Sequence, residues 1–334
     1  MYPEKVKRSL EHLSIRKIPI FLWGPPGVGK SSIVAQIAKE RGVGFIDLRL
    51  SLLDPTDLRG IPFFNANDNS AMWAPASFLP DGSIEEGILF LDELNTAAPM
   101  VQASAYQLIL DRKIGEYTLP EGWAIVAAGN RESDQGVVFR MASPLANRFV
   151  HLEIEVSVED WQTWAKIFSI DPTIIAFISY RPDALFTFDP SSDKKAFATP
   201  RTWEYVNEIL LSEPEDDILL DIISGAIGEE LAASFLGFKS VAKSLPDIDA
   251  ILDGSTSEVP NDTAALHILA TALTMRINQD TRSNTLDKLL RYTLLLPGEF
   301  AVMIVQDLRQ REIDLDYINS WGLWVKKFNS LLRP

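Results

Sequence analysis

The sequence contains no cysteine and only three histidines among its 334 residues. The lack of cysteine excludes disulfides, thiolate nucleophiles and cysteine-ligated zinc sites. The histidines, His12, His151 and His267, lie too far apart in the sequence for the spacing of a metal-binding motif. We therefore expect packing or surface roles for all three.

Long hydrophobic runs are also missing, since no stretch approaches the ~18 uninterrupted apolar residues that a membrane helix requires. Residues 1–17 are charged and amphipathic, and they lack the apolar centre of a signal peptide. Hydrophobic residues still make up 46% of the chain, which is ordinary for a protein with globular cores. These features predict a soluble, cytoplasmic protein with no membrane partner.

The sequence also lacks a surplus of basic residues, since 31 Lys and Arg stand against 46 Asp and Glu. The formal net charge of −15 argues against a broad electrostatic grip on nucleic acid, which normally needs a basic surface. Five basic residues do fall between Lys5 and Lys17, and we interpret them as a solvated helix face. Nucleic acid is thus an unexpected partner.

The first half of the chain alternates short apolar runs with helical patterns. Helical periodicity is clear at residues 30–41. Short, fully apolar strands separated by helices indicate a parallel sheet that is covered on both faces. The sequence therefore predicts an α/β fold, with strands at 18–23, 45–50, 88–91, 123–128 and 150–154.

Two other regions depart from this alternation. Residues 53–87 are rich in Pro, Asn, Asp and Gly, which predicts a projecting hairpin or loop between the second and third strands. From Ser157 onward only helices are expected, beginning after Ser157 and at Thr199-Pro200. The remaining helical segments are predicted at 215–227, 229–236 and 263–331, with a polar loop at 253–262.

A P-loop motif follows the first predicted strand and opens the first predicted helix. Its glycines let backbone N–H groups turn inward around a phosphate, toward which the helix directs its positive end. In this motif the lysine reaches the β- and γ-phosphates, and the serine hydroxyl binds Mg²⁺. The expected ATP-binding residues are Gly24, Pro25, Pro26, Gly27, Val28, Gly29, Lys30, Ser31 and Ser32.

An acidic pair, Asp92 and Glu93, ends the third predicted strand. In a chain with a P-loop, such a pair is typical of hydrolysis. Asp92 is expected to hold Mg²⁺ together with Ser31, and Glu93 to orient and activate the attacking water. We see no guanine-reading N-K-x-D motif, which favours ATP over GTP.

Three further residues are candidates with open alternatives. Asn130 follows the fourth strand and could hold the attacking water, or simply cap its loop. Arg148 could form a surface ion pair, or complete a neighbouring subunit's site as an arginine finger, which contributes ~10³ to 10⁵ in rate. Arg201, at the start of a helix, is a candidate nucleotide sensor.

Together these residues resemble an AAA+ ATPase, specifically the MoxR-like branch (the helix-2-insert clade). Their order and spacing across residues 18–210 are more specific than any one motif. The similar segments are GPPGVGKS (24–31), residues 88–120, AAGN (127–130), SPLANRF (143–149) and ATPRTWEYV (198–206).

The resemblance implies an αβα P-loop core at 1–155 and an all-α lid at 156–240. Residues 241–334 match no motif and are expected to form a C-terminal helical extension. By position, Asn130 matches sensor 1, Arg148 the trans-acting arginine finger and Arg201 sensor 2. Arg140 is a second arginine that could reach a subunit interface.

The resemblance also implies two hairpins that face partners in a ring, at 54–87 and at 109–122. On that basis Phe63 and Phe64 are candidates for substrate contact, unless they pack the hairpin onto its own core.

The function expected from this likeness is Mg-ATP-dependent, chaperone-like remodelling of a protein partner by a homo-hexameric ring. Family members commonly act on a partner that carries a von Willebrand factor A domain. An ATP-gated assembly adaptor and the motor subunit of a nucleic-acid-processing complex remain alternatives.

Overall fold

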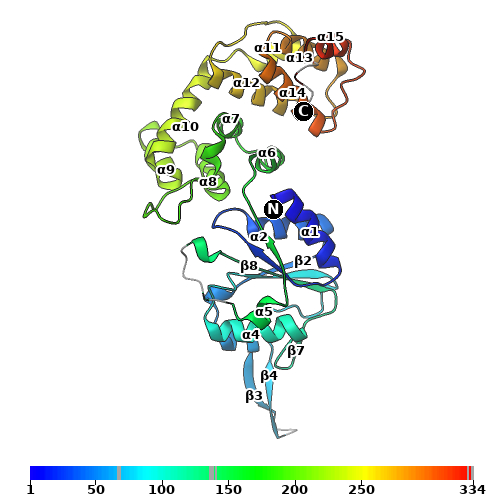
Figure 1. Cartoon of the computed structure of the whole chain (residues 1–334), viewed down its shortest axis with the longest axis vertical. Helices are drawn as coiled ribbons and strands as arrows, with labels where there is room; N and C mark the ends of the chain where they lie inside the picture. Colours follow the sequence, from blue (N-terminus) through cyan, green and yellow to red (C-terminus); the bar gives the residue numbers. More distant parts are fainter. Residues whose placement is uncertain (66–68, 135–138, 140, 329–330, 332–334) are drawn as a thin grey trace. The chain divides into compact units, whose positions relative to one another are not determined.

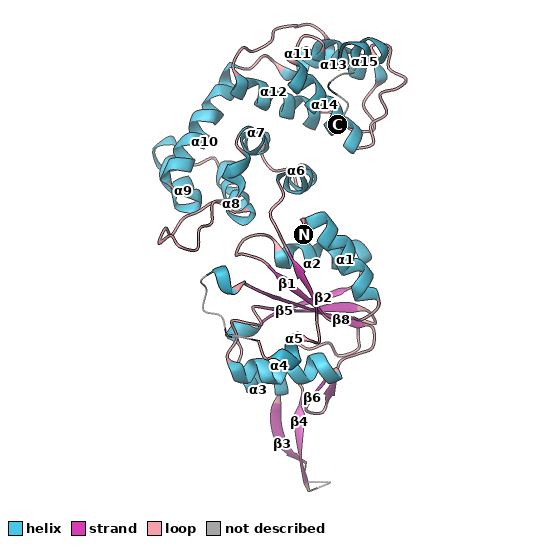
Figure 2. Cartoon of the chain, in the orientation of Figure 1, coloured by secondary structure: helices cyan, strands magenta, loops and turns pink. Residues whose placement is uncertain are grey.

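The structure, a computed structural model, describes residues 1–65, 69–134, 139, 141–328 and 331. The chain divides into two compact units, which we describe separately. All strands of the described residues lie in the first unit, and the second is built from helices (Figure 2). The first unit comprises Met1–Asp160, Phe188–Asp193 and Thr199–Arg201, and the second comprises Trp161–Thr187, Lys194–Ala198 and Thr202–Pro334.

A five-stranded parallel sheet forms the centre of the first unit, in the order β2-β5-β8-β1-β9. All seven residues of β8 are buried, because helices cover both faces of the sheet. The predicted α/β fold with a parallel sheet is confirmed. The strands are β1 (Ile20–Trp23), β2 (Gly44–Arg49), β5 (Gly87–Asp92), β8 (Trp123–Gly129) and β9 (Val150–Glu153).

The strand order places β8 between the strand that precedes the P-loop and the strand that ends in the acidic pair. Val126 of β8 pairs with Ile20 on one side and with Phe90 on the other. Because the strands are parallel, their carboxyl ends meet at one edge of the sheet, where ligands bind in such folds. Residues far apart in sequence are thereby brought together at this edge.

Helices cover the two faces of the sheet in an αβα arrangement (Figure 1). Val101, Ala105 and Leu108 pack with Leu89 and Leu91 of β5 in one hydrophobic core. One face carries α1 (Pro3–Ile15) and α2 (Lys30–Arg41), and the other carries α3 (Pro55–Arg59), α4 (Pro99–Asp111) and α5 (Ser143–Ala146).

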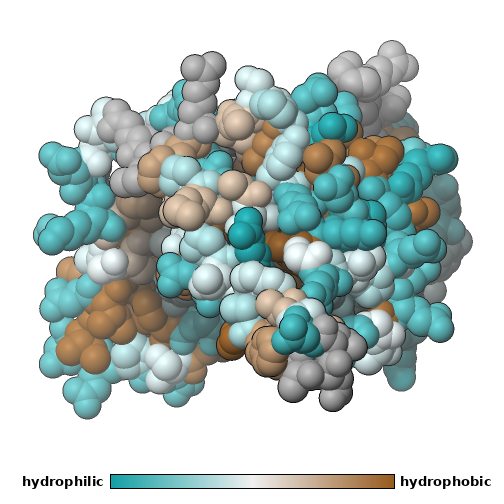
Figure 3. All heavy atoms as spheres, turned by 90° about the horizontal axis from the view of Figure 1, so that it is seen from below, coloured by the Kyte–Doolittle hydropathy of each residue, from teal (hydrophilic) through white to brown (hydrophobic). Residues whose placement is uncertain are grey.

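The predicted insertion between the second and third core strands contains α3 and a hairpin of β3 (Ile61–Asn65) and β4 (Ser70–Ala74). The hairpin projects from the first unit (Figure 1). Ile61 is 74% exposed and Phe64 is 66% exposed. Seen from the end of the molecule at which the hairpin projects, apolar patches lie among polar ones (Figure 3). The exposed fraction of Phe64 argues against packing of this side chain onto the hairpin's own core.

The second predicted hairpin is shorter than residues 109–122. It consists of β6 (Lys113–Ile114) and β7 (Tyr117–Thr118). Its first expected residues instead complete α4, which ends where Arg112 adopts a left-handed conformation with φ 56°. Apolar residues such as Leu108 and Ile109 are buried against the sheet side of α4 and extend the helix to Asp111.

The second unit is helical, as predicted from Ser157 onward. The hydroxyl of Ser157 accepts a hydrogen bond from the N–H of Asp160 and so caps the first helix of the series. The helices are α6 (Val158–Ile167), α7 (Pro172–Tyr180), α8 (Pro200–Leu211), α9 (Asp216–Ile227), α10 (Glu229–Val241), α11 (Ile248–Asp253), α12 (Thr263–Met275), α13 (Ser283–Thr293), α14 (Gly298–Gln310) and α15 (Trp321–Phe328).

The helix predicted at 229–236 was too short. Helix α10 continues past Gly237 to Val241, because Phe235 and Phe238 are buried on one face and hold the turn in place. The region predicted to be helical from residue 263 forms several helices with loops between them, the last of which ends at Phe328. No helix in the described ranges combines the length and apolar character needed to cross a membrane. The division of the helical part at residue 240 stays a prediction.

Candidate active site

The P-loop connects β1 to α2 and contains two glycines with positive φ. Gly27 has φ +76° and Gly29 has φ +90°, values that favour glycine because a Cβ would be strained there. A Cβ on Gly27 would also lie 2.5 Å from Oγ1 of Thr199, whereas one on Gly29 would meet open space. The loop thus depends on glycine both for its conformation and for the close approach of Thr199.

The first turn of α2 provides the features of a phosphate site. Gly29 is its N-cap and has no side chain with which to bond the first N–H groups of the helix. These N–H groups and the positive end of the helix dipole favour an anion at this point. Ser31 is partly buried and Ser32 is exposed. The cradle and donor set therefore fit the phosphates of a nucleotide.

Lys30 is held at the centre of the site by three acceptors. Its Nζ lies 2.7 Å from the carbonyl oxygen of Gly24, 3.0 Å from that of Pro25 and 3.0 Å from Oδ1 of Asn130. Burial lowers the pKa of Lys30 to about 8, while the carboxylates of Asp92 and Asp134 act in the opposite direction. A phosphate beside this ammonium would stabilise its charged form.

Asp92 ends β5 at the same sheet edge. Burial raises the pKa of its carboxyl, although the N–H of Glu93 and the charge of Lys30 partly oppose this rise. Its Oδ1 accepts the Glu93 N–H at 2.9 Å. Among the described residues no cluster of three His, Asp or Glu side chains could hold a metal. Ser31 and Asp92 provide a hydroxyl and a carboxylate, oxygen ligands of the kind that Mg²⁺ accepts together with phosphate or water oxygens.

Glu93 adopts a left-handed backbone conformation, with φ 57°. Its carboxylate accepts a hydrogen bond from the hydroxyl of Ser51, and Nε of Arg49 lies 3.8 Å from its Oε1. Ser51 and Arg49 lie at the end of β2, the strand next to β5. Sequence reasoning missed both residues, because only the strand order places them beside Glu93.

Asn130 follows β8, between the P-loop and the acidic pair. Its side chain accepts from Lys30, and its main-chain oxygen accepts from Nδ2 of the buried Asn95 at 2.7 Å. Gly129 is essential to this contact, because a Cβ there would lie 2.1 Å from Oδ1 of Asn95. Asn95, which sequence analysis did not single out, thus sets the position of Asn130.

An ion-pair network follows Asn130 directly. Arg131 pairs with the buried carboxylate of Asp134 at 3.1 Å and with Glu153 of β9 at 3.0 Å. These pairs raise the pKa of Arg131. The network ties the segment after Asn130 to β9, the edge strand that lies beyond β1 in the sheet.

The two predicted arginines differ in their placement. Arg201 is exposed, but its N–H donates to the carbonyl oxygen of Gly27 at 3.3 Å, and its charge lowers the pKa of Lys30. Arg148 is also exposed, and its side chain makes no hydrogen bond or ion pair within the described ranges. The structure therefore brings the backbone of Arg201 to the P-loop, whereas the Arg148 side chain is exposed and without a polar partner among the described residues. Arg140 lies outside the described residues.

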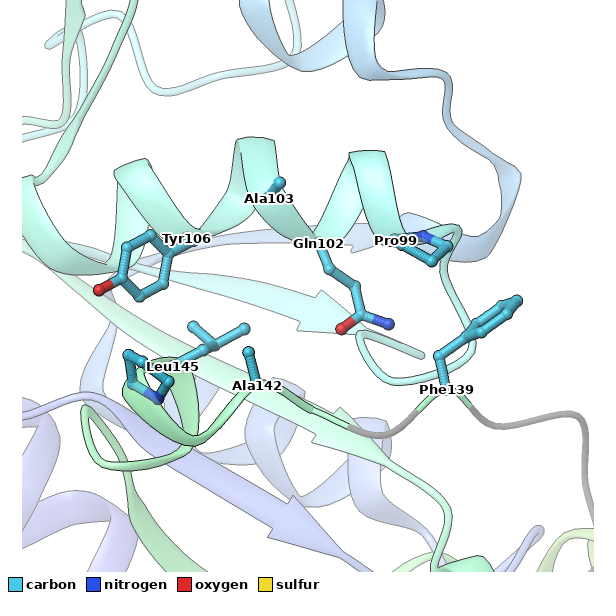
Figure 4. A pocket seen from close by; sticks show the side chains of 8 residues that line it. Pro99, Gln102, Ala103, Tyr106, Phe139, Ala142 and Leu145 are labelled. Carbon is cyan, nitrogen blue, oxygen red and sulfur yellow. The ribbon is translucent and has the colours of Figure 1, made fainter.

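A pocket of about 390 Å³ lies on the α4 face of the sheet (Figure 4). Its wall is mostly apolar, and Gln102 and Tyr106 of α4 contribute polar atoms. Phe139 in this wall donates its N–H to the carbonyl oxygen of Asn95 at 2.7 Å. The pocket was not predicted from the sequence. Its lining residues are Pro99, Gln102, Ala103, Tyr106, Phe139, Ala142, Pro144 and Leu145.

Residues 20–155 match the family "ATPase family associated with various cellular activities (AAA)". These residues are similar to that family, and the match covers less than half of the chain. With its P-loop and acidic pair, the chain is an ATP-hydrolysing P-loop NTPase.

Two curated proteins are similar over part of the chain. Midasin of Giardia intestinalis is 29% identical over 168 residues, which cover 47% of this chain and 3% of midasin. The Holliday junction branch migration complex subunit RuvB of Parabacteroides distasonis is 31% identical over 110 residues, 32% of this chain and 25% of RuvB. The chain thus spans only a small part of the length of these relatives.

Among solved structures, a RuvB variant of Thermotoga maritima matches with a TM-score of 0.41 and 19% identity, covering 81% of this chain and 80% of that one. NtrX of Brucella abortus in complex with ATP matches with a TM-score of 0.40 and 14% identity, covering 98% and 68%. Structural similarity at this level gives no information about the function of this chain.

Proposed function

We propose that this AAA domain drives a ring-forming, homo-hexameric remodeller of the MoxR-like branch, powered by Mg-ATP. One observation supports the proposal: three of the predicted active-site residues lie together, but the predicted arginine finger does not contact them. Lys30, Asp92 and Asn130 meet at one sheet edge, whereas the Arg148 side chain has no partner in the described part of its own chain. We infer that Arg148 of a neighbouring copy completes this site.

The proposal assigns the residues of the site as follows. Gly24 to Ser32 bind the nucleotide, Ser31 and Asp92 hold Mg²⁺, and Glu93 takes a proton from the attacking water. Mg²⁺ bound by these residues would neutralise charge on the phosphates. Asn130 fixes Lys30, and Arg201 contacts the loop that cradles the phosphates.

The subunit division proposed for this function is a core at 1–155, a lid at 156–240 and an extension at 241–334. The hairpin of β3 and β4 is proposed to contact the remodelled protein through exposed Phe63 and Phe64. A protein with a von Willebrand factor A domain is the proposed partner class, on the resemblance alone.

Mixing two inactive variants tests the shared site. Arg148→Ala lacks the finger and Glu93→Gln lacks the base, but a mixture contains interfaces with an intact P-loop, an intact Glu93 and an intact Arg148. We expect ATP turnover in the equimolar mixture to exceed the mean of the separate variants several-fold. The double variant mixed with itself is the matched control. A mixture that shows only the mean of the two rates would contradict a site completed in trans.

The specific turnover rate should also rise with protein concentration, measured over a hundredfold range, because assembly completes the site. A flat rate, with sizing that shows single chains at the lowest concentration, would reject the ring.

A nucleic-acid motor is a second candidate, since RuvB of Parabacteroides distasonis, described as a branch migration complex subunit, shares 31% identity over 110 residues. Stimulation of ATP turnover by DNA or RNA at moderate salt would support it. The Glu93→Gln variant distinguishes an ATP-gated adaptor from a remodeller. In an adaptor, this variant would keep partner binding and function when ATP is bound. In a remodeller, it would stall on the partner.

A further inference from the structure

One part of the second unit carries charge of a single sign. Between residues 202 and 238 there are nine acidic residues and no lysine, arginine or histidine. Globular proteins usually mix both signs along such a length. The acids gather where α8 ends and α9 begins, with exposed carboxylates at Glu208, Glu213, Asp217 and Asp221.

Helix α9 adds exposed apolar side chains to this acidic region. Ile218 is 46% exposed, Leu220 is 41% exposed and Ile222 is 37% exposed. The buried residues of α9 are Ile223 and Ile227, so the helix presents apolar side chains around most of its circumference. An apolar group with a polar rim is the composition of a protein interface. We call Tyr205, Glu208, Leu211, Glu213, Asp217, Ile218, Leu220, Asp221 and Ile222 the acidic face.

The first unit carries a surface of the opposite character on α1. Lys5, Arg8, His12 and Arg16 follow one another at helical spacing and are exposed, and Ile15 beside them is 62% exposed. The helix buries its opposite side through Val6, Leu10 and Ser14. None of the four basic side chains has an ion pair in the part of the chain that the structure describes. We call Lys5, Arg8, His12, Ile15 and Arg16 the basic stripe.

We propose that the acidic face of one copy docks on the basic stripe of a second copy of this chain. Each chain carries both halves of a complementary pair: acidic groups around Ile218 and Ile222, and basic groups around Ile15. The net charge of the chain is −15, so an acidic face is repelled by much of the surface of a second copy. The basic stripe instead attracts it, because its charges are of opposite sign and have no ion-pair partner among the described residues.

The two surfaces differ, so the contact is heterologous. Each copy offers its acidic face to one neighbour and its basic stripe to another, and such contacts close into rings or extend into filaments. The inference rests on the proposed assembly of several copies, but not on the assigned roles of the active-site residues.

Charge reversal in pairs tests the contact in the full chain. In the first variant Glu208→Lys, Glu213→Lys and Asp221→Lys reverse the acidic face, and these positions avoid the first turn of α9. In the second, Lys5→Glu, Arg8→Glu and Arg16→Glu reverse the basic stripe. We expect each variant alone to need at least about tenfold more protein for half-assembly, measured by sedimentation, because like charges then face each other.

An equimolar mixture of the two variants restores both contacts with their signs exchanged. We expect its assembly midpoint to return to within about threefold of the wild-type value and to rise with salt, since exposed charges are screened. The matched control, Glu258→Lys, Glu312→Lys and Asp280→Lys, changes the same total charge at exposed sites outside the acidic face and should assemble as wild type.

Single cysteines provide a measurement that does not depend on the reversed charges, because the chain has none of its own. Under oxidation, a His12→Cys chain mixed with an Ile222→Cys chain should form a disulfide-linked pair. His12→Cys mixed with Ser240→Cys, which places the thiol on exposed α10, should not.

The outcomes separate the inference from the proposed function. If wild-type and charge-reversed chains assemble alike, or if the mixture of variants stays dispersed, the proposed contact is rejected but the proposed ring is not. A cross-link within one chain carrying both cysteines, without one between chains, would also overturn it. If the wild-type chain never assembles, both the contact and the ring fall.

Discussion

The hydroxyl of Ser51 donates a hydrogen bond to the carboxylate of Glu93. Ser51 lies just beyond β2 and Glu93 just beyond β5, and these strands are neighbours in the sheet. The proposed base is therefore held by a residue from the turn that follows the neighbouring strand. This contact gives the first prediction.

Replacing Ser51 by alanine should lower the ATP turnover number while leaving nucleotide affinity unchanged. A hydrogen bond to a charged group contributes about 1.5 to 3 kcal/mol, and because Ser51 is exposed we expect the lower end of this range, a loss on the order of tenfold. Ser51→Thr keeps the hydroxyl and should keep most of the rate. Turnover in Ser51→Ala equal to or above wild type would show that Ser51 does not hold Glu93 in its productive position.

Glu93→Gln should bind ATP and barely turn it over, because the amide cannot accept the proton of the attacking water. General-base groups contribute ~10² to 10⁴ in rate, and we expect a loss in that range. Fluorescent-nucleotide titration and phosphate release measure the two properties separately. Glu116→Gln, at an exposed hairpin turn, is the control for a lost carboxylate. A loss of ATP binding equal to the loss of turnover would contradict the assignment.

Nucleotide binding should take up protons at alkaline pH. Burial lowers the pKa of Lys30 to about 8, whereas bound phosphates would stabilise its charged form and raise that pKa. Above about pH 8 the lysine must therefore gain a proton on binding, and nucleotide affinity should fall as the pH rises. Calorimetry at about pH 9 in two buffers of different ionisation enthalpy measures the uptake, which should be nearly absent at about pH 6.5.

Lys39→Gln removes an exposed lysine from the end of α2 and should leave the uptake intact. Affinity that stays constant from about pH 7 to about pH 9.5 would show that Lys30 does not meet the phosphates with a lowered pKa.

Gly129→Ala should both destabilise the first unit and slow ATP turnover. The added carbon would lie 2.1 Å from Oδ1 of Asn95, and overpacking of a buried site costs about 1 to 3 kcal/mol. Denaturant unfolding measures the change in the free energy of unfolding. Adding Asn95→Ala should recover part of this stability, because it removes the clashing oxygen. Two strictly additive losses would mean that the contact does not form.

Arg201→Ala should weaken nucleotide binding and raise the pKa of Lys30, since the arginine charge lowers that pKa. The proton uptake described above should then shift to higher pH. Lys194→Ala, in a segment of the second unit, serves as a control for a lost cation. Unchanged affinity and turnover would remove Arg201 from the site.

Local sequence patterns predicted much of the fold. Apolar runs predicted the five core strands to within about two residues, because burial on both faces leaves an uninterrupted apolar signal. The pattern in residues 30–41 gave the limits of α2, since a helix with one buried face shows its period directly. The end of α4 and the length of α10 were misjudged, because long-range packing rather than local residue preference extends these helices.

The sequence by itself determined the P-loop, the acidic pair and the single-sign acidic stretch, because each rests on residues that are neighbours in the chain. Only the tertiary structure decided that Ser51 holds Glu93, that Asn95 positions Asn130, and that Lys30 reaches Asn130. The strand order β2-β5-β8-β1-β9 brings these pairs together. That order depends on which apolar strands pair across long loops, and the pairing follows from the packing of the whole sheet rather than from any local pattern.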